Sequence, residues 1–127
     1  MNVMYVASDN CLSSGAFKSM VKLCELERDI YNINPIVVLP YYGDGEELLK
    51  SAKLNYVYVK SEDWIVSNIS ESSKEFIKKR IKVLLNFFSI IKLEHLIKEK
   101  NIDIVHINTS YTYVGAIAAK KMHIPIV

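Results

Sequence analysis

The feature that most constrains the fold is a regular alternation of apolar, β-prone runs with helical stretches. The strand-like runs are residues 2–7, 35–40, 54–60, 101–108 and 124–127. A run without polar interruption, such as 35–40, is typical of a strand that is covered on both faces. The βαβαβαβαβ order therefore predicts an α/β fold. We expect a three-layer Rossmann-like domain with a mostly parallel sheet of about five strands and helices on both faces.

Length and composition limit the classes of protein that the chain can form. A chain of 127 residues is long enough for one hydrophobic core but not for two, so residues 1–127 are predicted to be a single domain. A net charge of +2 is too small to indicate nucleic-acid binding. The longest nearly apolar run, 83–91, is far shorter than the ~20 residues needed to cross a bilayer. With no signal-peptide core either, the sequence predicts a cytoplasmic protein.

A short loop of small residues, 8–16, joins the first strand to the helix that follows it. Such a loop aims free backbone N–H groups at one point, where the carboxyl ends of the strands also lie, and this favours anionic ligands. The loop has one glycine, Gly15, and matches neither the dinucleotide nor the ATP-binding glycine pattern. Ser13 or Ser14 is also suited to cap the helix, which is compatible with ligand binding.

The fourth strand carries polar side chains towards its carboxyl end. By alternation, His106 and Asn108 share one face of the sheet. Asn108, Thr109 and Ser110 fall on the predicted ligand side, and their amide and hydroxyl groups suit a substrate rich in hydroxyls. His106 is open to two interpretations, a packed histidine at the edge of the core or a catalytic base. No residue is assigned a catalytic role, and the three histidines lack metal-ligand spacing, so no metal is predicted.

The long helical stretch 73–100 is strongly basic, with eight basic and three acidic residues. One interpretation is an amphipathic helix that packs on the sheet and exposes a lysine face. The other is attachment to an anionic lipid surface through Lys78, Lys79, Arg80 and Lys82, with aromatic residues inserted. A break near 87–89 would split the stretch and leave its first part exposed.

Several segments, in their order along the chain, resemble the retaining GT-B glycosyltransferases of family 4. Residues 2–8 followed by 14–19 resemble the opening of these enzymes, and 35–40 resembles their second strand. Residues 103–110, followed by Val114-Gly115-Ala116, resemble their fourth strand and the next helix, and Ile124-Pro125 resembles the lead-in to their fifth strand. The resemblance covers nearly the whole chain through short motifs.

The resemblance implies that the chain is the N-terminal, acceptor-binding half of a two-domain glycosyltransferase, cut after strand five. In this family the first-domain loop, here Ser14, Gly15 and Ala16, reaches the donor diphosphate; the usual glycine pair is Gly15-Ala16 here. The acceptor would meet His106, Asn108, Thr109 and Ser110. The implied partners are a nucleotide-sugar donor and a glycan or lipid-linked acceptor, without an organic cofactor.

The same resemblance implies a hexosyltransferase of polysaccharide or cell-surface glycan synthesis, acting at the inner face of the membrane. Residues 1–127 alone are expected to be inactive, because the second domain binds most of the donor. The alternative is a stand-alone Rossmann-like or receiver-like binding module. A receiver needs an acidic pair after its first strand, whereas here Ala7-Ser8 is followed by the single acid Asp9.

Overall fold

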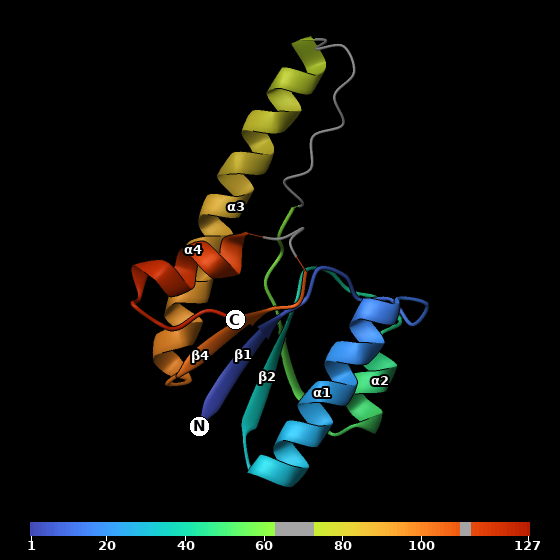
Figure 1. Ribbon diagram of the computed structural model, residues 1–127. Coiled ribbons are helices and arrows are strands. Elements are labelled where there is room, and N and C mark those ends of the chain that lie inside the picture. The colour runs from blue at the N-terminus through green and yellow to red at the C-terminus, as the bar shows by residue number, and fades with distance from the viewer. Residues whose placement is uncertain (63–72, 110–112) are drawn as a thin grey trace.

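The computed structural model describes residues 1–62, 73–109 and 113–127, and it confirms the α/β architecture (Figure 1). The elements alternate in the order β1 (Asn2–Val6), α1 (Gly15–Tyr31), β2 (Asn34–Leu39), α2 (Glu46–Ser51), β3 (Asn55–Tyr58), α3 (Ser73–Glu99), β4 (Ile104–Ile107) and α4 (Val114–Lys121). No helix within these described residues is long and apolar enough to cross a membrane.

The sheet is parallel throughout, with strand order β3-β2-β1-β4. In this register Val6 of β1 pairs with Val38 of β2 on one side and with Ile107 of β4 on the other. This order is that of a mononucleotide-binding half of a Rossmann fold, in which the third strand lies outside the second. A receiver has the order 2-1-3-4-5, so the topology excludes that alternative.

The described sheet has four strands, and our prediction of about five is corrected in this respect. At the predicted fifth position the chain forms an isolated parallel bridge between Val105 and Ile126. The Val105 amide donates to the Pro125 carbonyl at 2.9 Å, and the Val127 amide donates to the Val105 carbonyl at 2.9 Å. Residues 125–127 run beside β4 and form this single bridge rather than a ladder.

Two hydrophobic cores lie on opposite faces of the sheet. Tyr5 from β1 packs with Phe17 and Cys24 of α1 on one face, whereas Met4 packs with Leu93 of α3 on the other. Successive residues of a strand point to opposite faces, so a strand between two helical layers must be apolar at every position. Burial raises the pKa of the Cys24 thiol to about 12, which makes it an unreactive core residue.

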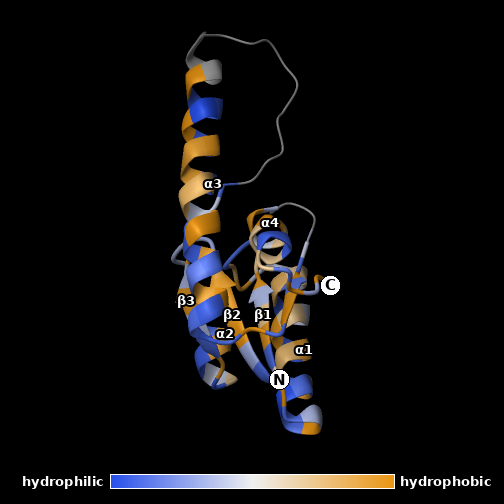
Figure 2. Ribbon diagram, turned by 90° about the vertical axis from the view of Figure 1, so that its left-hand side faces the viewer, coloured by the Kyte–Doolittle hydropathy of each residue, from blue (hydrophilic) through white to orange (hydrophobic). Residues whose placement is uncertain are grey.

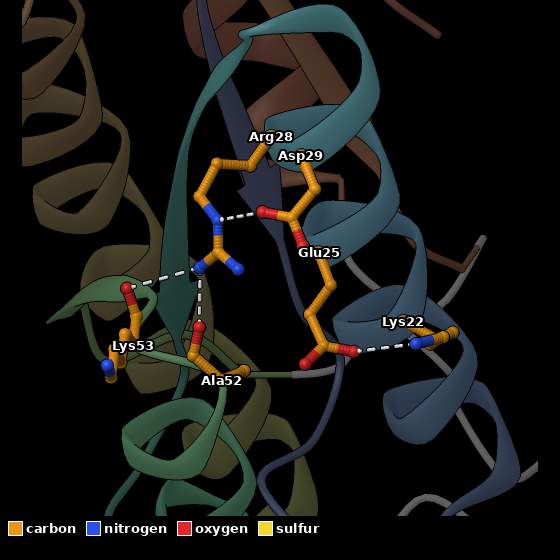
Figure 3. A network of polar contacts seen from close by, with 6 residues as sticks. All are labelled: Lys22, Glu25, Arg28, Asp29, Ala52 and Lys53. Atoms are coloured by element: carbon orange, nitrogen blue, oxygen red, sulfur yellow. Dashed lines mark hydrogen bonds and ion pairs between the residues drawn. The ribbon is translucent and has the colours of Figure 1, made fainter.

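Polar contacts hold α1 against the end of α2 (Figure 3). The Arg28 side chain donates to the carbonyl of Ala52, directly after α2, while its Nε lies 2.8 Å from the Asp29 carboxylate. Lys22 and Glu25 form a further exposed pair at 3.2 Å. Exposed ion pairs contribute little stability, so the main effect of Arg28 is to fix the position of α2.

Helix α3 is continuous, so the predicted break at 87–89 is absent. Its C-terminal half packs on the sheet through Leu93 and Ile97. The N-terminal half extends past the edge of the sheet at which the strands end (Figure 1), and Figure 2 shows hydrophobic residues along much of it. Asn86 is buried where the helix leaves the body; its Oδ1 accepts from the Glu62 amide at 2.9 Å and its Nδ2 donates to the Tyr113 hydroxyl at 3.0 Å.

Candidate functional site

The N-terminus of α1 lies at the carboxyl edge of the sheet, and Ser14 is its capping residue. The Ser14 hydroxyl accepts from the Phe17 amide at 3.2 Å and donates to the Asp9 carboxylate at 3.0 Å. The capping role predicted for Ser13 or Ser14 is thus confirmed for Ser14, and the hydroxyl has both of its hydrogen-bonding functions in use.

Gly15 and Ala16 form the exposed start of the helix. A Cβ at Gly15 would meet no atom within 4 Å, so a ligand can approach this turn freely. The first amides of a helix have no acceptor within the helix, which makes them a site for anions. Asp9 places a carboxylate beside this turn, where its charge opposes that of an incoming diphosphate. The geometry therefore allows a phosphate contact but a weak one.

Asn108 joins the end of β4 to the same loop. Its side-chain amide donates to the Ala16 carbonyl at 3.3 Å, across 92 positions of sequence. Two groups of predicted site residues, from the first loop and from the fourth strand, thus meet in the structure. Thr109 follows at the same edge and is half-buried, whereas Ser110 lies outside the described residues.

His106 lies within β4, an outer strand of the described sheet, and its side chain is half-buried. It pairs in register with Tyr5, and the two ring centroids are 5.0 Å apart. The Tyr5 hydroxyl donates to Glu27 on α1. Burial lowers the pKa of His106 below its usual value, while the charge of Glu27 opposes this shift. The imidazole is therefore neutral at pH 7, and its role as a catalytic base stays a prediction.

This environment of His106 makes the stability of the fold depend on pH. The unfolded chain, with an ordinary histidine pKa of about 6.5, binds a proton more readily than the folded chain. Stability is therefore expected to fall as the pH drops from about 7.5 to about 5.5. Urea unfolding should show this loss in the wild type and a smaller one in His106→Gln. His95→Gln, at an exposed position of α3, should keep the wild-type pH dependence.

Asn10 is a site-organising residue that the sequence did not reveal. It is 1% exposed, and its Nδ2 donates to the Tyr41 carbonyl at 3.0 Å. Its carbonyl accepts from the Gly45 amide at 3.4 Å, and a Cβ at Gly43 would lie 2.0 Å from the same oxygen. The loops after β1 and β2 are therefore locked together. In the sequence, only the two glycines of residues 41–45 indicate that this loop closely approaches another part of the backbone.

The basic residues predicted to face a membrane lie on the projecting half of α3. Lys78, Arg80 and Lys82 are exposed and Lys79 is half-buried. Lys82 lies 3.6 Å from the Glu62 carboxylate. Among the residues that the structure describes, no group of three or more His, Cys, Asp or Glu could hold a metal ion.

A parallel sheet of this order with helices on both faces is a Rossmann-like domain, a fold in which ligands bind beyond the carboxyl ends of the strands. Solved glycosyltransferases share this fold. MurG of Acinetobacter baumannii superimposes with a TM-score of 0.70 at 16% identity, over 98% of this chain and 33% of that one. Anabaena HepE in complex with UDP-glucose gives 0.66 at 16% identity, over 99% and 28%. A glycosyltransferase from Rickettsia africae gives 0.64 at 14% identity, over 98% and 28%.

The chain belongs to the glycosyl transferase 4-like family, whose model matches residues 50–127. The family and the GT-B fold that the sequence predicted are thereby confirmed. The chain spans about a third or less of the length of the solved proteins given above. A comparison with curated protein sequences finds no match.

Proposed function

We propose that the chain is the N-terminal, acceptor-binding half of a two-domain enzyme that transfers a hexose from a nucleotide-sugar to a glycan or lipid-linked acceptor. The observation that carries this proposal is the meeting of Asn108 with the exposed first turn of α1 at the carboxyl edge of the sheet. Exposed helix-start residues and polar side chains thus lie together where the parallel strands end, which is where ligands bind in open α/β sheets. Polysaccharide or cell-surface glycan synthesis is the pathway class that fits such a reaction.

In this proposal the residues of the edge have separate tasks. Gly15 and Ala16 offer backbone amides to the donor diphosphate, and Ser14 holds the turn in place. Asn108, Thr109 and Ser110 bind hydroxyl groups of the acceptor, with His106 behind them. The complex of HepE with UDP-glucose supports a nucleotide-sugar as donor, because that protein shares the fold. The larger part of the donor would be held by a second domain.

A titration with UDP-glucose tests the donor part of the proposal. Amide shifts of residues 1–127 are expected at Gly15, Ala16 and Asn108, with a Kd in the millimolar range or about 4 kcal/mol of binding free energy. No sugar transfer is expected. Micromolar binding, sugar transfer by residues 1–127, or shifts confined to the opposite edge of the sheet would contradict this division of tasks.

We further propose that α3 attaches the protein to an anionic membrane surface, at the inner face of the membrane in the cytoplasm. Six apolar side chains of its projecting half are each between 51% and 64% exposed: Ile77, Ile81, Val83, Leu84, Phe87 and Phe88. Exposed apolar residues so close together are uncommon on a monomer without a partner.

Their position on the helix supports this proposal. Ile77, Ile81, Leu84 and Phe88 recur at helical spacing and form one stripe, while the buried Leu93 and Ile97 belong to the opposite face. The stripe therefore points away from the body. Residues 77–92 contain five basic residues and no acidic one, so the complementary surface is anionic. A lipid-linked acceptor would then be delivered beside the carboxyl edge of the sheet.

A further inference from the structure

A cluster of tyrosines at the β3 side of the carboxyl edge has no role in the function proposed so far. Tyr42, in the loop after β2, is 79% exposed, and its ring centroid lies 4.1 Å from that of Tyr58. Tyr58 is the last residue of β3 and is in turn packed edge-to-face against Tyr56 at 5.9 Å. The exposed ring of Tyr42 is thus backed by Tyr58, which is itself packed against Tyr56.

The chain on either side of Tyr42 is also held firmly. Asn10 bonds the Tyr41 carbonyl, and the Leu12 amide donates to the Asp44 carboxylate at 2.8 Å. The Tyr56 hydroxyl donates to Glu46 at 3.4 Å, which fixes the cluster to the start of α2. The loop that carries Tyr42 is therefore held in place and its ring lies against Tyr58, and preorganisation of this kind reduces the entropic cost of binding.

The charge around the ring limits the class of ligand. Residues 41–50 contain three acidic residues and one lysine, which disfavours phosphates. The Glu46 carboxylate is a hydrogen-bond acceptor at this surface: it accepts from the Tyr56 hydroxyl at 3.4 Å and lies 3.5 Å from the Lys50 ammonium. The face of an aromatic ring carries partial negative charge and attracts polarised C–H groups. A neutral sugar ring, with C–H groups on one face and hydroxyls at its rim, meets both conditions.

We infer that Tyr42, backed by Tyr58 and flanked by Glu46, is a stacking platform for a neutral hexose unit of the acceptor. The inference rests on the proposed acceptor-binding function and extends its site from Asn108 across the Asn10 contact to the loop after β2. The sugar ring stacks on the exposed face of Tyr42, and its hydroxyls donate to the Glu46 carboxylate.

Titration of residues 1–127 with four methyl glycosides tests the platform: glucoside, galactoside, mannoside and N-acetylglucosaminide. Each is taken to about 100 mM, where a Kd of tens of millimolar still gives measurable occupancy. For the best ligand, Tyr42→Ala should weaken binding by about fivefold, whereas Tyr42→Phe, which keeps the ring, should stay within about twofold. Tyr31→Ala is the matched control, because Tyr31 is 70% exposed and is the last residue of α1, whose first turn lies at the carboxyl edge of the sheet.

The outcomes separate this inference from the function on which it rests. If Tyr42→Ala binds the glycoside as the wild type does, while shifts at Asn108 persist, the stacking role of Tyr42 is contradicted but acceptor binding at the carboxyl edge is supported. If none of the four glycosides shifts any amide of the carboxyl edge, the platform and the acceptor site both fail. A loss in Tyr42→Ala with Tyr31→Ala unchanged supports the platform.

Discussion

The triple variant Ile81→Ser/Leu84→Ser/Phe88→Ser is expected to bind vesicles of phosphatidylglycerol and phosphatidylcholine more than tenfold more weakly than the wild type. Each of these side chains is more than half exposed, so insertion into lipid gains about 1 kcal/mol per residue, roughly half of the value for full burial. Three such losses exceed the ~1.4 kcal/mol that corresponds to a factor of ten. Vesicle co-sedimentation measures the change.

The thermal stability of this variant should stay close to that of the wild type, because none of the three side chains belongs to a core. Leu26→Ser/Ile30→Ser, at exposed positions of α1, is the matched control and should bind vesicles normally. Binding to vesicles by the triple variant at the wild-type level would contradict the lipid contact. Dimerisation of the wild-type chain through the apolar stripe of α3, without binding to vesicles, would also contradict the lipid contact.

The basic residues should make this binding depend on the lipid headgroup. Lys78→Gln/Lys82→Gln removes two charges near the surface, each worth about 1 kcal/mol against anionic lipid. Binding to vesicles with phosphatidylglycerol should therefore fall, while the weaker binding to pure phosphatidylcholine should not change. Added salt should have the same effect as the substitution, because it screens the attraction.

Phe17→Ala is expected to cost about 3–5 kcal/mol of the free energy of unfolding, as for other fully buried phenylalanines. Phe17 is 0% exposed in the first turn of α1, and its Cε1 lies 2.7 Å from where a Cβ at Gly45 would stand. The ring therefore supports both loops of the carboxyl edge. Urea unfolding measures the loss, which is a large share of the ~5–15 kcal/mol typical of a domain.

The same substitution should loosen the loop 41–45, since the ring beneath it is gone. Amide hydrogen exchange in this loop is expected to accelerate more than in β1. Ile30→Ala, at a position 65% exposed, is the control and should change stability by no more than about 0.5 kcal/mol. A Phe17→Ala chain as stable as the wild type would contradict the described packing of α1.

The layers of the fold could be predicted from the sequence because they follow from local patterns. A strand such as 35–40 is apolar at every position, and this requires cover on both faces, which the structure has. The capping of α1 by Ser14 follows equally from residue type and position. The strand order could not be derived in this way, because it depends on pairing between distant segments.

The faces of α3 could not be predicted from hydropathy. Asn86 and Ser89 are buried, whereas Leu84 and Phe88 are exposed. The polar pair is buried because it satisfies backbone groups of the segment after β3: Asn86 bonds Glu62, and Ser89 donates to the Lys60 carbonyl. The apolar pair is exposed because the helix continues beyond the sheet. The burial of the polar pair and the exposure of the apolar pair both depend on tertiary structure, which the periodicity of hydrophobic residues in the sequence does not indicate.

Only part of the candidate site could be predicted from the sequence, because some of its residues depend on tertiary contacts. Gly15, Ala16 and Asn108 follow from the rule that ligands bind where parallel strands end, and the structure brings them together. Asn10 has no local signal, since its importance comes from burial between two loops. The support of Tyr42 by Tyr58 likewise requires β2 and β3 to be neighbours.

The most direct test of the acceptor site is a map of amide shifts on the wild-type chain, saturated with the best-bound of the methyl glycosides. We expect shifts at the carboxyl edge of the sheet, around Gly15, Tyr42 and Asn108, and unchanged signals at the opposite edge, around Tyr31 and Asn101. Shifts centred on the opposite edge, or on the α4 face of the sheet, would contradict this expectation.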